Sequence, residues 1–247
     1  MKTLSDNNSK NNRLEILLQK FLDDFAIIPV IGAEIEFYVM GDMPDLKYKV
    51  KAEKGQGQFE IDIFPQNNIY ETIEEIEKAK KYLLSFPNIT LHPKPYPDDY
   101  GSAMHFHVNF VTEKGDNFFD DNSRLEHAAR SLCHFLEEHM SVFAPKAYHY
   151  DRFDHKFMAP THVCFGGNNR TVAIRIPDLK PKRLEHRISA PDVDSNEAIY
   201  AILEAIYYGL SQPSSIRYYE KIYGNAFDSQ YGLLPIKALS RRFRFII

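Results

Sequence analysis

Apolar residues recur every three to four positions in four segments of the chain, which is the spacing of one face of an α-helix. Leu14, Leu17 and Phe21 begin the first of these segments. Asp194 and Glu197 have the spacing of a capping box, which marks the start of the last one. The pattern predicts helices over residues 11–26, 68–86, 123–143 and 195–211.

Other segments alternate between apolar and polar residues, as a strand does when one of its faces is buried. In the clearest case, Ile35 and Phe37 alternate with Glu34 and Glu36. Strands are predicted near residues 30–40, 47–53, 57–64, 89–93, 102–111, 161–166, 171–176 and 183–189. The stretch 144–160 has no clean period and is predicted to be a loop, either a plain connection or a lid. Strands and helices do not alternate regularly, so the chain is predicted to have an α+β fold with a mainly antiparallel sheet.

Four of the predicted strands carry polar faces dominated by carboxylate, imidazole or guanidinium groups. Residues two apart share a face of a strand. These faces consist of Glu34 and Glu36, of Gln58, Glu60 and Asp62, of His105, His107 and Asn109, and of Arg183, Glu185 and Arg187. Each face alone is also typical of a solvated sheet surface. Together they differ from the solvated face expected at Lys47, Lys49 and Lys51, because they contain no lysine.

If these strands are neighbours, several carboxylates and a histidine converge, and the cluster repels itself unless divalent cations neutralise it. Carboxylate-rich ligation with one imidazole suits Mg²⁺ or Mn²⁺ better than Zn²⁺. Arginines beside such a cluster suit phosphate, which their planar fork binds with two hydrogen bonds. Metal, arginine and phosphate together are the groups used in phosphoryl transfer.

Composition limits the classes of protein to which the chain could belong. The chain has 247 residues, a formal net charge of −4 and two cysteines, Cys133 and Cys164. No stretch approaches the roughly 20 apolar residues of a membrane span, and the first residues lack the apolar core of a secretory signal. Two cysteines cannot build a disulfide framework, and a mildly acidic chain disfavours nucleic acid as a partner. We therefore expect a cytoplasmic protein that binds neither nucleic acid nor membrane.

Five motifs in this sequence resemble, in the same order, those of the glutamine synthetase catalytic domain. They lie at residues 32–37 (GAEIEF), 53–60 (EKGQGQFE), 101–107 (GSAMHFH), 169–177 (NRTVAIRIP) and 183–187 (RLEHR). The resemblance implies a curved, mainly antiparallel sheet with flanking helices. It places this domain at residues 30–235, after a polar segment and helix at 1–29 and before a basic-aromatic tail at 236–247.

The resemblance also implies two sites for Mg²⁺ or Mn²⁺, ATP as a co-substrate, and a set of site residues. One metal site would use Glu36, Glu53 and Glu60, and the other would use Glu34, His105 and Glu185. His107 would lie beside the nucleotide, and Arg170, Arg175 and Arg183 would face the ATP phosphates. Arg152 and Arg187 would hold the amino-acid substrate, so Arg152, Arg170, Arg187 and Glu53 are the expected catalytic residues.

The sequence departs from the family pattern at the part of the site that receives ammonia. Met158 falls where the family has a glutamate that helps to take a proton from ammonium, and Tyr100 replaces an asparagine that helps to hold glutamate. About 30 residues precede Gly32, so by length the family's N-terminal β-grasp domain is expected to be missing. A homo-oligomer, or a partner chain that supplies this domain, is compatible with that expectation.

Two functions follow from these features. The first is an ATP-dependent ligase that joins glutamate, or a similar carboxylate, to ammonia or a larger amine through an acyl phosphate. The alternative is a catalytically impaired protein that binds metal and nucleotide in a regulatory or interaction role.

Overall fold

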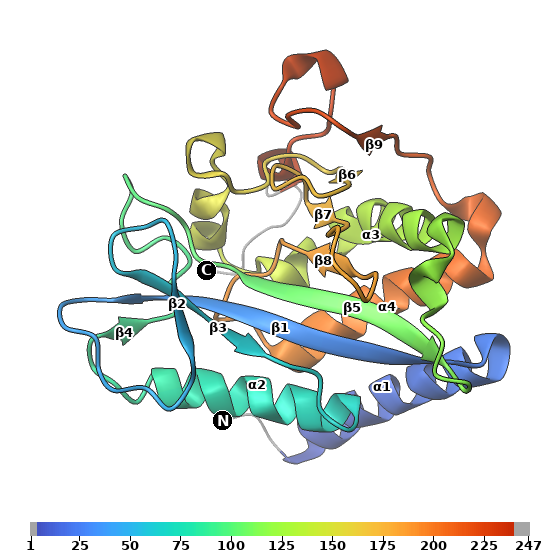
Figure 1. Cartoon of the computed structure of the whole chain (residues 1–247), viewed down its shortest axis with the longest axis horizontal. Coiled ribbons are helices and arrows are strands. Elements are labelled where there is room, and N and C mark those ends of the chain that lie inside the picture. Colours follow the sequence, from blue (N-terminus) through green and yellow to red (C-terminus); the bar gives the residue numbers. More distant parts are fainter. Residues whose placement is uncertain (1–3, 240–247) are drawn as a thin grey trace.

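The long strands β1 (Ile27–Val39) and β5 (Met104–Thr112) form the centre of one sheet (Figure 1). The computed structural model describes residues 4–239. The other strands are β2 (Val50–Ala52), β3 (Gln58–Ile63), β4 (Ile89–Thr90), β6 (Phe165–Gly166), β7 (Ile174–Arg175), β8 (Leu184–His186) and β9 (Lys221–Ile222). Their order is β2-β3-β1-β5-β8-β7-β6-β9, with β4 paired to the end of β1. All pairs are antiparallel except β6 with β7 and β6 with β9, which confirms the predicted α+β fold.

Four long helices cover one face of this sheet. They are α1 (Leu4–Phe25), α2 (Ile69–Leu83), α3 (Asn122–Phe143) and α4 (Ser195–Ser211), and a short α5 (Ile236–Leu239) follows. The predicted cap of α4 is confirmed, because the Asp194 carboxylate accepts hydrogen bonds from the backbone N–H groups of Asn196 and Glu197. Asn68 and Asp121 cap α2 and α3 in the same way.

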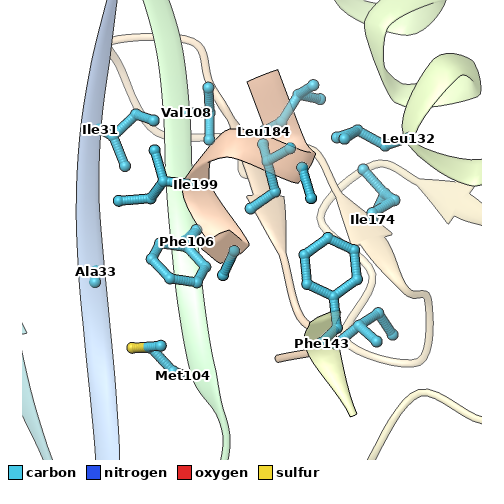
Figure 2. Close-up of a cluster of buried hydrophobic side chains, with 14 of the residues drawn as sticks. Ile31, Ala33, Met104, Phe106, Val108, Leu132, Phe143, Ile174, Leu184 and Ile199 are labelled. Atoms are coloured by element: carbon cyan, nitrogen blue, oxygen red, sulfur yellow. The ribbon is translucent and has the colours of Figure 1, made fainter. Parts of the chain in front are cut away.

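The core lies between these helices and the apolar face of the sheet. Figure 2 shows Phe106 of β5, Phe143 of α3 and Ile199 of α4 in one cluster of side chains. All three are at most 1 % exposed. Because alternate residues of β1 and β5 point into this core, the intervening Glu34, Glu36, His105 and His107 point to the opposite face.

Several element boundaries differ from the prediction. β1 begins at Ile27, three residues before the predicted strand, and α1 buries Leu14 and Phe21 in the same core. The predicted loop 144–160 contains two 3-10 turns, Ala147–Arg152 and His155–Phe157, which are too short to show a helical period.

The later predicted strands shrink to two or three residues each, and β9 was not predicted. Strands of this length carry almost no alternation, so sequence pattern cannot delimit them. Within residues 4–239 no helix combines the length and the apolar character needed to cross a bilayer. Of the predicted tail 236–247, residues 240–247 lie outside the described part of the chain.

Candidate active site

The polar faces of β1, β3 and β5 meet on the side of the sheet that the helices leave free. Glu36 lies opposite Glu60 in the register of β1 with β3. Glu34 lies opposite Asp62 of β3 on one side and His105 of β5 on the other. The strand register therefore brings the polar side chains of three strands together in one acidic cluster.

All six predicted metal ligands line one cavity of about 270 Å³. They are Glu34, Glu36, Glu53, Glu60, His105 and Glu185. One ligand atom each from Glu34, Glu60 and His105 lie within 4.8 Å of one another. This group combines Glu60 from one predicted metal site with two residues from the other, so the two predicted sites adjoin.

Glu34 lies between two imidazoles. His105 Nδ1 is 3.3 Å from Glu34 Oε2, and His107 Nε2 is 3.0 Å from Glu34 Oε1. Arg183 Nε donates to His107 Nδ1 at 3.1 Å, which leaves the ring proton of His107 on Nε2. Burial by itself raises the pKa of Glu34, but the two histidines together hold that pKa well below its usual value.

The other carboxylates of the cluster repel one another. Burial, and then the negative charges of Glu34 and Glu36, raise the pKa of Glu60 to about 7. Burial also raises the pKa of Glu36, whose Oε2 accepts a hydrogen bond from the Ala103 N–H at 2.7 Å. Crowded carboxylate oxygens beside one imidazole fit the ligand preference of Mg²⁺ or Mn²⁺, and a divalent cation would relieve this repulsion.

Two arginines flank the cluster at Glu185, which is 2 % exposed. Arg175 Nη1 lies 2.6 Å from Glu185 Oε2, and Arg187 Nε lies 3.1 Å from Glu185 Oε1. Burial raises the pKa of Glu185, but the charges of His105, Arg187 and Arg175 lower it below its usual value overall. Both arginines line the cavity, as does the exposed Arg170. The cavity thus combines acidic groups with guanidinium groups able to bind phosphate.

Of the predicted nucleotide-facing residues, His107 and Arg183 do not line this cavity. They stand beside it, joined to each other and to Glu34 by the contacts described above.

Arg152 lines the cavity but uses its guanidinium to hold the backbone. Its Nε, Nη1 and Nη2 donate to the carbonyls of Ser102, Ile188 and Arg187 at 3.1, 3.2 and 2.9 Å. The side chain is 2 % exposed, and burial lowers its pKa to about 10. Arg152 therefore joins the segment before β5 to the segment after β8, which carries Arg187.

One end of the cavity is walled by Tyr100, Phe157 and Met158. The rings of Tyr100 and Phe157 are 5.5 Å apart and meet edge to face. Lys94 Nζ lies 3.6 Å from the centre of the Phe157 ring and donates a hydrogen bond to the backbone carbonyl of Asp99. Met158 has a φ of 56°, a left-handed conformation that turns the chain after the 3-10 turn His155–Phe157. Tyr100 and Met158, where the sequence is expected to depart from the family pattern, thus line the same cavity.

Sequence reasoning did not assign Lys51 or Phe157 to the site, although both line the cavity. Lys51 was expected on a solvated face with Lys47 and Lys49. Its position is decided by pairing with β3, where it lies opposite Glu60. Phe157 lies in a segment without a period, so no pattern pointed to it.

Comparison with known proteins identifies the family of this chain. Residues 45–242 match the family described as "Glutamine synthetase, catalytic domain". The chain therefore belongs to this family of ligases, whose members use ATP and divalent metals.

Among the relatives, the gamma-glutamylputrescine synthetase PuuA of Escherichia coli (strain K12) is 28 % identical over 198 residues, which cover 75 % of this chain and 42 % of that protein. A glutamine synthetase of Sulfolobus acidocaldarius is 30 % identical over 170 residues, 63 % of this chain and 35 % of the relative. This chain thus spans less than half the length of these relatives.

Among solved structures, a "GmaS/ADP complex" superposes with a TM-score of 0.75 over 94 % of this chain and 68 % of that one, at 19 % identity. A cryo-EM structure of Plasmodium falciparum glutamine synthetase gives a TM-score of 0.72 over 87 % of this chain and 58 % of that one, at 14 % identity. At these identities the likeness concerns the fold.

Proposed function

We propose that this protein is an ATP-dependent ligase that joins the side-chain carboxylate of glutamate, or of a similar acid, to an amine. The observation that carries the proposal is the single cavity lined by five carboxylates, His105 and several arginines. Acidic groups that could hold divalent cations and guanidinium groups that could hold phosphates stand together in it, as phosphoryl transfer requires.

A carboxylate is a poor electrophile, so the reaction would begin by activating it. A carboxylate oxygen attacks the γ-phosphorus of ATP, the bond from that phosphorus to the ADP oxygen breaks, and an acyl phosphate and ADP form. The amine nitrogen then attacks the acyl carbon, the bond from that carbon to the phosphate oxygen breaks, and inorganic phosphate leaves as the nitrogen loses a proton. Divalent cations, when bound, would neutralise charge on the transferred phosphoryl group.

The role of each residue in this reaction would follow from its position in or beside the cavity. Arg170 and Arg175 would contact the phosphates from the rim of the cavity, with Arg183 and His107 beside them toward the nucleotide. Arg187 would hold the carboxylate of the amino acid. Arg152 would support it by fixing the carbonyls of residues 187 and 188.

We further propose that the amine is an organic amine rather than ammonia. Met158 cannot accept a proton from ammonium, and the wall that it forms with Tyr100 and Phe157 is apolar and aromatic. Such a wall suits the carbon chain of an amine. The similarity to a gamma-glutamylputrescine synthetase supports this choice of substrate class.

The proposal is tested by measuring phosphate release with ATP and Mg²⁺ across a panel of carboxylates and amines, and by confirming product masses. We expect release above the ATP-only background with glutamate and at least one organic amine. Glu60→Gln should abolish it, whereas Glu113→Gln, a change at an exposed residue away from the cavity, should not. No release for any pair would overturn the ligase proposal.

A further inference from the structure

Lys51 places an ammonium group inside the acidic cluster. It lies on β2 directly opposite Glu60 of β3. Its Nζ is 3.2 Å from Glu60 Oε1 and 2.6 Å from Asp62 Oδ1, so one cation holds two carboxylates of the same strand. The Lys51 side chain is 45 % exposed, whereas that of Glu60 is 8 % exposed. The lysine thus reaches a buried carboxylate from the solvent side.

The two partners of Lys51 are not equivalent. Glu60 belongs to the group in which ligand atoms of Glu34, Glu60 and His105 lie within 4.8 Å. Asp62 lies outside that group, does not line the cavity, and makes the shorter contact with Lys51. An ammonium that leaves Glu60 therefore keeps a partner.

We propose that Lys51 is an internal counter-cation that competes with a divalent metal ion for the Glu60 carboxylate, and that Asp62 receives the lysine when the metal binds. This inference rests on the metal sites of the proposed function. An ammonium and a divalent cation on one carboxylate repel each other, so metal binding at Glu60 must work against Lys51. Glu34, His105 and Glu185 make no contact of this kind with the lysine. Metal binding at the site that uses Glu60 is therefore weaker than it would be without the lysine.

The first test measures binding of Mn²⁺ alone to the chelator-treated protein by titration calorimetry and by electron paramagnetic resonance. Lys51→Met, which keeps an unbranched side chain but removes the charge, should tighten one Mn²⁺ site about tenfold and leave the other within about twofold. Lys51→Arg keeps the charge and should stay near the wild-type value. Lys49→Met, at an exposed lysine two residues earlier, is the matched control.

The second test asks whether Asp62 is the alternative partner. Asp62→Asn leaves Lys51 with Glu60 alone and should weaken the same Mn²⁺ site several-fold. In the Lys51→Met background the Asp62 change should have no further effect, because no ammonium remains to be held. If the Asp62 change weakens binding equally in both backgrounds, Asp62 acts by its own charge and the transfer to Asp62 is refuted.

The outcomes also separate this inference from the proposed function. Two Mn²⁺ sites that are unaffected by Lys51→Met would overturn the role of Lys51 while leaving the metal sites in place. Absence of Mn²⁺ binding in both the wild type and Lys51→Met would overturn the metal sites and this inference together. Matching circular dichroism spectra of the variants show that a changed affinity does not come from unfolding.

Discussion

The ring of Tyr100 meets the ring of Phe157 edge to face, with their centres 5.5 Å apart, at one end of the acidic cavity. The contact joins the segment before β5 to the 3-10 turn that precedes Met158. Tyr100 and Met158 are the two positions that we expect to differ from the family at the amine end, and both line this cavity.

Met158→Glu should raise ammonia-dependent turnover at least about tenfold, because a carboxylate at this place can take a proton from ammonium. Met158 has a left-handed backbone conformation. Glutamate adopts this conformation at about the same cost as methionine, so the change adds no new strain. Phosphate release with ammonium chloride, compared with release with the best organic amine, measures the shift. An unchanged or lower rate with ammonium would contradict the placement of Met158 at the amine site.

Glu185→Gln should weaken binding of ATP in the presence of Mg²⁺ by at least about tenfold, because one proposed ligand to the metal becomes neutral. Glutamine keeps the volume of the side chain between Arg175 and Arg187, so the fold is preserved better than with alanine. Titration calorimetry of ATP, with and without Mg²⁺, is the measurement, and Glu113→Gln is the control. Equal ATP affinity in Glu185→Gln and the wild type would remove Glu185 from the ligand set.

Arg152→Met should lower the free energy of unfolding by roughly 3 kcal/mol, because three backbone carbonyls lose charged donors in a buried place. Urea unfolding followed by circular dichroism measures the loss. Arg170→Met is a useful comparison, since the exposed Arg170 should change stability by less than about 0.5 kcal/mol while ligase activity falls. If Arg152→Met is as stable as Arg170→Met, Arg152 does not hold the backbone of the site.

His186 should make the protein less stable in mild acid. Its ring packs 4.3 Å from that of Phe143, and among residues 4–239 neither of its nitrogens has a hydrogen-bond partner. Burial lowers the pKa of His186 from 6.5 to about 3. Below about pH 6.5 the unfolded chain therefore binds a proton that the folded protein excludes, so stability is full above that pH and falls as the pH drops toward 3.

At about pH 5 this loss amounts to roughly 2 kcal/mol relative to neutral pH. His186→Leu should remove it, so that the free energy of unfolding changes less between about pH 7 and about pH 5 than in the wild type. Urea unfolding at both pH values is the measurement, and His155→Gln, at an exposed histidine, should keep the wild-type difference. An unaltered difference in His186→Leu would show that other groups cause the acid sensitivity.

Much of the site could be predicted because alternation along a strand is a local property. Glu34 and Glu36 on β1, and His105 and His107 on β5, lie on the face opposite the core, as their spacing predicts. The α4 cap at Asp194 was also readable, since it depends on residues within one turn. Elements of two or three residues were less readable, because so short a stretch has no period: β7 was predicted too long, and β9 was not predicted.

The sequence by itself determined which side chains share a face of each strand, and therefore which chemistry the chain carries. Only the tertiary structure decided which faces meet. The register of β2 on β3 sets Lys51 against Glu60, although the same alternation would equally suit a solvated lysine. In the same way, the packing of the 3-10 turn Ala147–Arg152 directs the Arg152 guanidinium toward three backbone carbonyls. The reason is that register and packing depend on burial summed over the whole core, which no single segment contains.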